Sequence, residues 1–398
     1  MTRNDQDIVL AAPVRTPIGR FGGVLAPLTA ADLGTAAAKA ALERAALDPG
    51  RVDQVIFGHA RQAGGGPNTA RQIAYRAGVP VDRPAYTVNQ ACGSGLQAVI
   101  SAARAILLGE AQVVLAGGTE SMSNTPYLLP RARWGYRLGH TEIVDGMYQD
   151  GFNDPLSQLV MGETAEELAE EAGIDRAASD AWAVESQNRS ERARAKNRFS
   201  SEIAPVTVPG KKGDIQVDTD EHPRDGVTLA SLAKLAPVFR EGGRVTAGNA
   251  SGITDGAAAI VVASRRAASE LGLPVVARLV GWEVVGVEPR IMGIGPVPAV
   301  RRLLAKTGVD LKAIDEVELN EAFACQVLAC LKDLDFPHET VNPDGGAISL
   351  GHPIGATGAR ILVTLLHGMA ARGGERGIAT LCVSGGLGLA ALVEREAA

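Results

Sequence analysis

One pattern occurs twice in this chain of 398 residues: a glycine-rich turn opens an amphipathic helix, which leads into a short apolar strand. The first turn surrounds Cys92 in QACGSGLQAV and precedes the strand at 113–118. The second surrounds His352 in SLGHPIGATGAR and precedes the strand at 378–386. Continuous apolar strands that alternate with helices indicate buried sheets covered on their faces. We therefore expect an α/β protein with two pseudo-symmetric βαβ-type halves whose sheets are largely parallel.

A second alignment supports this repeat. At one constant offset, Asp48, Asp53, Val55 and Ala60 match Asp310, Asp315, Val317 and Ala322. The two glycine-rich turns then lie at equivalent ends of two sheets, where they can face each other. Catalytic groups often occupy such loops at the carboxyl ends of strands.

The region between the halves is rich in proline and charge, and its pattern predicts helices at 163–172 and 177–198. A strand at 257–264 is expected to return to the first half. The expected boundaries are 1–120 plus 248–272 for the N-terminal half, 121–247 for an inserted lid-like domain, and 273–398 for the C-terminal half.

Charge and composition exclude several classes of protein. With 39 Lys and Arg against 45 Asp and Glu, the chain has no basic excess, so we expect no nucleic-acid partner. No long stretch lacks polar residues or glycine, so we expect no membrane-spanning helix. The four cysteines are too few for a disulfide framework and lack the spacing of a zinc site, so we expect no metal and a cytoplasmic location.

Cys92 is the strongest candidate nucleophile from the residues alone. It lies between an extended segment and a helix start, where free N–H groups and a partial positive charge favour a thiolate. His352 lies on a compact glycine-lined turn and is a candidate base. The alternative is that Cys92 is a small buried hydrophobic residue and His352 a solvated loop residue.

Other polar positions leave both interpretations open. Cys382 ends a predicted strand and could be a core residue, and we interpret Cys325 and Cys330 as core residues of an apolar helix. Asn320 and Glu321 follow a strand and could be capping or site residues. The segment Gly93–Ala98 also fits the G-x-G-x-x-A dinucleotide motif, but the preceding strand is poor and no acidic residue lies about 20 positions on.

Taken together, the motifs closely resemble those of the thiolases, the family of acetyl-CoA acetyltransferases and 3-ketoacyl-CoA thiolases. The resemblance runs nearly end to end. In family order, it includes VRTPIGRFGG, NQACGSGLQA, AGGTESMS, MGETAE, AGNASGITDGAA, MGIGPVPA, NEAFA, NPDGGAISLGHPIGATGAR and LCVSGGLG. It implies a five-layered α-β-α-β-α core with an inserted loop domain that covers coenzyme A.

The resemblance also implies roles for individual residues. Cys92 would carry the acyl group, and His352 would take its proton. Cys382 would exchange a proton with the α-carbon of the second acyl-CoA. Asn320, through a water molecule, and His352 would form one oxyanion hole, and the backbone N–H groups of Cys92 and Ser384 would form the other.

The resemblance implies that acyl-CoA and CoA are substrates and products, with no separate cofactor. The implied CoA-binding residues are Ser251, Arg224 and Ser231. The implied acyl-pocket residues are Met161, Met292 and Phe323. The family forms dimers and often tetramers, so a homodimer or a dimer of dimers assembled through the inserted loop is implied.

Two positions depart from the family's pattern. Ser384 stands where the family's cysteine motif usually has glycine, and a positive φ there would strain the serine. Val160 stands where many short-chain biosynthetic members carry histidine, which leaves longer 3-ketoacyl substrates open.

We therefore expect a thiolase that condenses two acetyl-CoA molecules to acetoacetyl-CoA plus CoA, or cleaves a longer 3-ketoacyl-CoA, as in fatty-acid β-oxidation. One alternative is a decarboxylating ketoacyl synthase, against which the second thiol, Cys382, argues. Another is a non-catalytic acyl-CoA-binding relative, which should lack part of the catalytic set. A nicotinamide-dependent enzyme is the weakest alternative.

Overall fold

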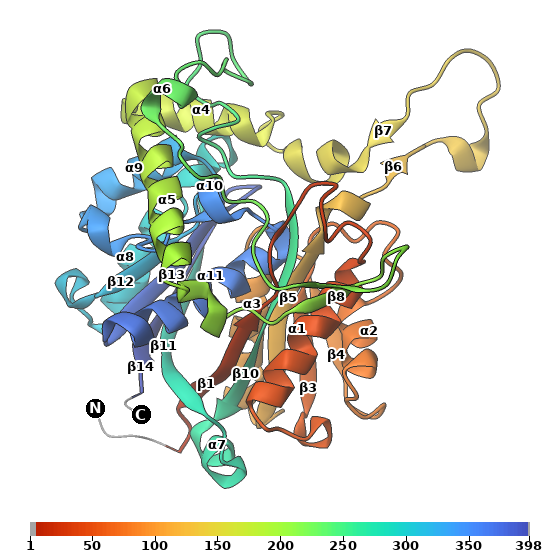
Figure 1. The fold of residues 1–398 in the computed structure, drawn as a ribbon, viewed down its shortest axis with the longest axis vertical. Coiled ribbons are helices and arrows are strands. Elements are labelled where there is room, and N and C mark those ends of the chain that lie inside the picture. Colours follow the sequence, from red (N-terminus) through yellow and green to blue (C-terminus); the bar gives the residue numbers. More distant parts are fainter. Residues whose placement is uncertain (1–4, 397–398) are drawn as a thin grey trace.

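The computed structural model describes residues 5–396, so the expected outer boundaries at 1 and 398 lie outside the described residues. Within them, a 10-stranded sheet has the order β12-β13-β14-β11-β1-β10-β5-β3-β4, with β2 paired to β10 (Figure 1). Its strands are β1 (Ile8–Arg15), β2 (Gly19–Arg20), β3 (Gln54–Gly58), β4 (Ala85–Val88), β5 (Val113–Ser121), β10 (Thr254–Ser264), β11 (Val275–Gly286), β12 (Glu316–Leu319), β13 (Arg376–Val383) and β14 (Leu387–Arg395).

The sheet is mixed, so the expectation of largely parallel sheets is wrong. Only the pairs β3–β4, β3–β5 and β12–β13 are parallel among the described strands. The long central strands β1, β10, β11 and β14 pair antiparallel with their neighbours. Continuous apolar runs report burial on both faces, and burial does not fix strand direction. The β1–β11 pair also joins the two expected sheets into one continuous sheet.

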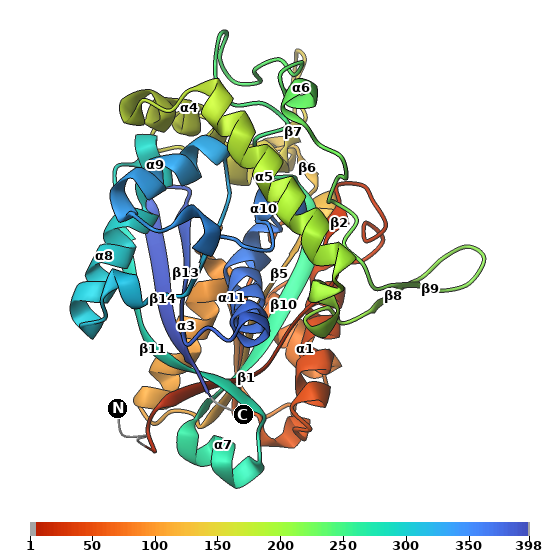
Figure 2. The same cartoon turned by 60° about the vertical axis from the view of Figure 1, so that its left-hand side comes forward.

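Helices and the two parts of this sheet form five alternating layers (Figure 2). One outer layer packs on the N-terminal strands, a central helix pair lies between the two parts of the sheet, and a second outer layer packs on the C-terminal strands. The outer helices are α1 (Ala30–Arg44) and α2 (Thr69–Arg76) on one side and α8 (Pro296–Thr307) and α9 (Ala324–Leu334) on the other. The central pair is α3 (Ser94–Leu107) and α11 (Ile354–Arg372).

The two central helices follow the predicted turns and end where predicted. Gly109 after α3 and Gly373 after α11 both have φ of 76°, which favours glycine. The helices touch through backbone: a Cβ on Gly95 would lie 2.7 Å from the Ala359 nitrogen, and one on Gly358 would lie 2.4 Å from the Leu96 nitrogen. This close crossing brings together the chain segments that enter α3 and α11.

The remaining elements lie mostly in the segment between β5 and β10. A thin arm that includes β6 (Tyr127–Leu128) and β7 (Val144–Asp145) extends away from the body of the fold (Figure 1). A π-helical turn at Tyr148–Phe152 follows it. The other elements are α4 (Met161–Ala172), α5 (Arg176–Ala195), β8 (Val206–Val208), β9 (Ile215–Val217) and α6 (Leu229–Leu232), with α7 (Arg265–Leu271) after β10 and the short α10 (Ala347–Leu350) before α11.

By length and composition, α11 is the one described helix apolar enough to cross a membrane. However, 83% of its most apolar window is buried inside the protein. It packs against α3 and the sheet in the central apolar cluster. Its hydropathy is that of the central helix of a packed core.

Candidate active site

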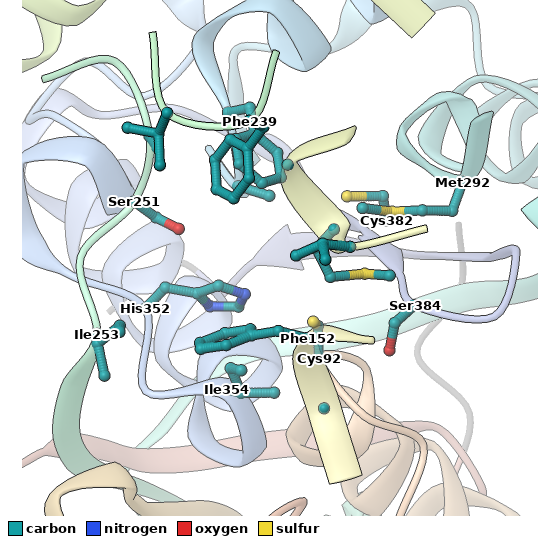
Figure 3. A pocket seen from close by; sticks show the side chains of 18 of the residues that line it. Cys92, Phe152, Phe239, Ser251, Ile253, Met292, His352, Ile354, Cys382 and Ser384 are labelled. Carbon is teal, nitrogen blue, oxygen red and sulfur yellow. The ribbon is translucent and has the colours of Figure 1, made fainter. Parts of the chain in front are cut away.

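A largely apolar cavity of about 270 Å³ lies where the Cys92 turn, the His352 turn and the β13–β14 connection meet (Figure 3). The segment between β5 and β10 supplies much of the remaining wall. The lining residues used below are Arg61, Cys92, Phe152, Met161, Ser251, Met292, Phe323, His352, Cys382 and Ser384. The predicted meeting of Cys92 and His352 is therefore confirmed by their shared cavity.

A tight turn presents Cys92 to this cavity. The Ser94 hydroxyl accepts from the Gln90 N–H (2.8 Å) and donates to the Ala91 carbonyl (2.7 Å). Ala91 is held at φ 44°, a conformation that costs a residue with a Cβ some strain. The turn also packs on the C-terminal half, because a Cβ on Gly93 would lie 3.1 Å from Val383 Cγ2.

The expected effect of N–H groups at the helix start on the Cys92 thiol is present in the structure, but burial outweighs it. Burial raises the pKa of the Cys92 thiol above its ordinary value. The Arg61 guanidinium and hydrogen bonds from the N–H groups of Ser384 and Cys92 lower this pKa but only partly offset burial. The resting nucleophile is a thiol that must lose its proton to a base.

His352 is held as a neutral imidazole. Burial lowers the pKa of His352 to about 3, and the charges of Arg360 and Arg61 add to this effect. Its Nδ1 lies 2.6 Å from the Thr357 hydroxyl, which donates to the Pro353 carbonyl at 3.0 Å. Because that hydroxyl has only one proton, it accepts from Nδ1–H and leaves Nε2 as the proton acceptor.

Cys382 and Ser384 come from the end of β13 and the turn that follows it. The pKa of the Cys382 thiol is raised well above its ordinary value by burial and by the neighbouring Cys92 and Cys330. Ser384 is not among the described residues with positive φ, whereas Gly385 and Gly386 have φ of 85° and 83°. The serine is therefore unstrained, and its N–H points at the Cys92 sulfur.

Asn320 lies just after β12 and is 1% exposed. It is not among the cavity-lining residues, and neither its Oδ1 nor its Nδ2 has a hydrogen-bond partner. A buried amide in this state is typical of a site that holds a water molecule. Glu321 has a structural role instead, because it accepts from the Trp182 indole (3.0 Å) and the Ser186 hydroxyl (2.7 Å).

The structure places the other candidates in two groups. Ser251, Met161, Met292 and Phe323 line the cavity. Arg224 and Ser231 are exposed and do not line it. The Ser231 hydroxyl donates to the Thr228 carbonyl at the start of α6 (2.7 Å).

Sequence reasoning missed two charged residues near this site. Buried Glu120 accepts from the backbone N–H groups of Ala60 and Arg61 and from that of Gly355 in α11. Burial opposes its ionisation, but His59 and Arg61 hold the pKa of Glu120 below its ordinary value. Arg61 itself lines the cavity. Their only sequence signal is polar residues at the ends of apolar strands, and such residues are also common in ordinary loops.

The chain matches two family models that together span most of its length. The model described as thiolase, N-terminal domain matches residues 8–266. The model described as thiolase, C-terminal domain matches residues 273–395.

Full-length relatives and solved structures are similar to this chain. It is 50% identical to an acetyl-CoA acetyltransferase of Pseudomonas aeruginosa and 49% identical to one of Cupriavidus necator, in each case over 98% of this chain and 100% of the relative. The structure of a Bacillus anthracis acetyl-CoA acetyltransferase superposes with a TM-score of 0.96 at 46% identity, covering 98% of this chain and 99% of the other. A human mitochondrial 3-ketoacyl-CoA thiolase in complex with CoA has a TM-score of 0.95 at 42% identity, with 99% of each chain covered.

Proposed function

The chain belongs to the thiolase family, and from this premise we propose which of its residues transfer the acyl group. Its activity is that of an acetyl-CoA acetyltransferase or 3-ketoacyl-CoA thiolase. Such an enzyme joins two acetyl-CoA molecules into acetoacetyl-CoA and CoA, or cleaves a 3-ketoacyl-CoA with CoA. The observation that supports the residue assignment is one apolar cavity holding Cys92, Cys382 and a neutral His352.

In the cleavage direction, His352 Nε2 takes the proton of Cys92, and the thiolate attacks the 3-keto carbon. The backbone N–H groups of Cys92 and Ser384 donate to the resulting oxyanion. Both already point at the Cys92 sulfur, so little reorganisation is needed as charge develops. The bond between C2 and C3 then breaks, which leaves the acyl group on Cys92 and an acetyl-CoA enolate.

Cys382 gives its proton to C2 of the enolate, and acetyl-CoA leaves. The enolate oxygen is held by protonated His352 and by a water molecule bound to Asn320, whose free amide supports this role. The Cys382 thiolate next takes the proton of CoA, and the CoA sulfur attacks the acyl group. Cys92 leaves as a thiolate and recovers its proton from His352, so every proton is returned.

Thr357 is the positioning residue for His352 in this scheme. We expect Thr357→Val to lower kcat by about 10- to 100-fold with little change in KM, because the imidazole loses the acceptor that fixes its tautomer. Thr357→Ser should recover most of the loss. Steady-state kinetics on both variants test this, and a wild-type kcat in Thr357→Val would contradict it.

For substrate binding, we propose Ser251 near the pantetheine, Arg224 and Ser231 near the outer part of CoA, and an acyl pocket formed by Met161, Met292 and Phe323. The three acyl-pocket residues and Ser251 share the cavity with Cys92, which supports their assignment. Arg224 and Ser231 are exposed outside the cavity, where the anionic end of CoA could reach them. We propose that the segment 121–247 covers the bound CoA and that the chain works in the cytoplasm.

We propose a homodimer or a dimer of dimers, with the arm around β6 and β7 as one contact. The support is a group of large exposed apolar side chains on this arm. It comprises Tyr127, Leu129, Trp134, Leu138 and Ile143. Such a group on one projecting segment is typical of an interface.

Thiolysis of a series of 3-ketoacyl-CoA chain lengths tests the proposed function. We expect CoA-dependent cleavage of acetoacetyl-CoA or of longer members, with no requirement for malonyl-CoA. Condensation that needs a malonyl thioester would indicate a decarboxylating synthase instead. Acyl-CoA binding without cleavage at any length would indicate a non-catalytic relative.

A further inference from the structure

Arg61 is a charged residue in the otherwise largely apolar cavity that holds the thiols of Cys92 and Cys382. Among the described lining residues it is the only Arg, Lys, Asp or Glu, and it is just 6% exposed. The same cavity is also lined by the apolar residues Phe152, Ile354 and Met161. A buried cation in apolar surroundings is costly unless acceptors satisfy it, so its retention needs a reason.

Only some of the N–H donors of the Arg61 guanidinium have acceptors among the described residues. A guanidinium carries five N–H donors, and here Nη1 donates to the Asp150 carbonyl at 3.1 Å. Nε is buried without an acceptor. No carboxylate oxygen of the described residues forms an ion pair with Arg61 within 4.0 Å. The nearby charge of Glu120 is already engaged by backbone N–H groups and by His59.

The guanidinium is also fixed in place. Gly151 lies against it so closely that a Cβ there would be 1.7 Å from Nη2. The Phe152 ring centroid lies 5.8 Å from the Arg61 Cζ. The Arg61 backbone N–H is held by Glu120. A cation held this way is preorganised for a ligand, because little side-chain freedom remains to be lost on binding.

We propose that Arg61 is a specificity-determining residue that binds a carboxylate at the far end of a short acyl chain. The preferred substrates are then 3-ketoacyl-CoA thioesters whose acyl group is itself a carboxylic acid. This inference rests on the proposed function and specifies its substrate class. Nη2 is the guanidinium nitrogen left for such a ligand, because Nη1 donates to the Asp150 carbonyl, Nε is fully buried, and no described residue accepts from Nη2.

Chemistry at the reacting end also suggests that the chain is short. The charge of Arg61 acts on both Cys92 and His352, so it lies near the site of acyl transfer. When the acyl carbonyl carbon is bonded to Cys92, a carboxylate at the other end of the acyl chain can contact Arg61 only if a few carbons separate the two groups. A neutral chain of equal length leaves the cation unpaired, and sites built for a polar group reject analogues that lack it.

The test compares 3-oxoadipyl-CoA with 3-oxohexanoyl-CoA, which share a chain length and differ by a terminal carboxylate. We expect the wild type to favour the carboxylated substrate in kcat/KM by about 10²-fold. In Arg61→Leu this ratio should fall to about one, and in Arg61→Lys it should be intermediate. Any help that Arg61 gives to Cys92 affects both substrates equally and cancels in the ratio.

Two results would overturn the inference: equal kcat/KM values for the two substrates in the wild type, or an unchanged ratio in Arg61→Leu. Either would leave the thiolase function standing, since both compounds are cleaved. Failure of the wild type to cleave either compound or acetoacetyl-CoA would instead count against the proposed function.

A second measurement needs no turnover. Iodoacetate and iodoacetamide both alkylate a thiol: the S–C bond forms, iodide leaves, and the thiol proton passes to a base. We expect the iodoacetate-to-iodoacetamide rate ratio at Cys92 to fall by about 10-fold in Arg61→Leu, because the anionic reagent loses its cationic partner. An unchanged ratio would contradict an anion site at Arg61.

Discussion

Cys92→Ala is expected to lower kcat/KM for thiolysis by at least about 10⁴-fold, because the bond that carries the acyl group can no longer form. The fold should persist, since Cys92 lies on a turn that is held by the Ser94 hydroxyl and by backbone contacts rather than by its own side chain. Initial rates measure the loss. Mass spectrometry of acid-quenched protein measures the acetyl group that the wild type carries on this residue.

The matched control is Cys330→Ala. Cys330 is a buried thiol whose pKa burial raises to about 12, and it does not line the cavity. We expect the thiolysis activity of the Cys330→Ala enzyme to stay within about threefold of wild type, because the substitution makes only a modest change in the core. An acetyl group trapped on a cysteine other than Cys92 in the wild type, or substantial thiolysis by Cys92→Ala, would contradict the assignment.

Cys382→Ala is expected to lower the rate of condensation by about 10³-fold, because the α-carbon of the second acetyl-CoA loses its base. Acetylation of Cys92 by acetyl-CoA should be slowed much less, since the CoA thiolate that leaves is a weak base and can take its proton from protonated His352 or from water instead of from Cys382. This separation of the two half-reactions is the signature of the proposal. A loss of packing alone would slow both half-reactions.

Two measurements check it: acetyl-enzyme formation by mass spectrometry, and exchange of the acetyl-CoA α-protons with solvent deuterium. Exchange of the α-protons should be abolished in Cys382→Ala, which has no base at this position. It should also be abolished in Cys382→Ser, because a hydroxyl is a much weaker acid than a thiol and does not ionise to supply the base. The raised pKa of Cys382 suits a group that must remove a proton from carbon, since the basicity of its thiolate rises with that pKa. Normal exchange in either variant would contradict the role.

The directions of the strands within the sheet could not be predicted from the sequence, although the helices could. The helix positions and their glycine stops could be predicted, because periodicity and backbone conformation are local properties. The direction of β10, β11 and β14 could not, because apolar runs look the same in either direction. The β1–β11 pairing, which joins the halves, depends on residues far apart in the sequence.

Some features of the candidate active site could likewise be predicted from the sequence, and others could not. Motifs predicted Cys92, His352 and Cys382 as site residues, and the three line one cavity, but the burial that raises the pKa of Cys92 could not be predicted. A helix start and a nearby base are visible in the sequence, whereas desolvation depends on everything packed around the sulfur. Asn320 was identified by resemblance, but its lack of partners is a property of the packed interior.

The sequence by itself determined the chemical groups and the local turns that present them: a cysteine before one helix, a histidine before another, and a cysteine at a strand end. Only the tertiary structure decided the shape of the cavity that these groups share, that the imidazole is neutral, and that Arg61 lies beside them without an ion-pair partner among the described residues. The reason is physical: residue type and turn geometry are set over a few residues, whereas burial, charge balance and cavity shape arise when distant segments pack together.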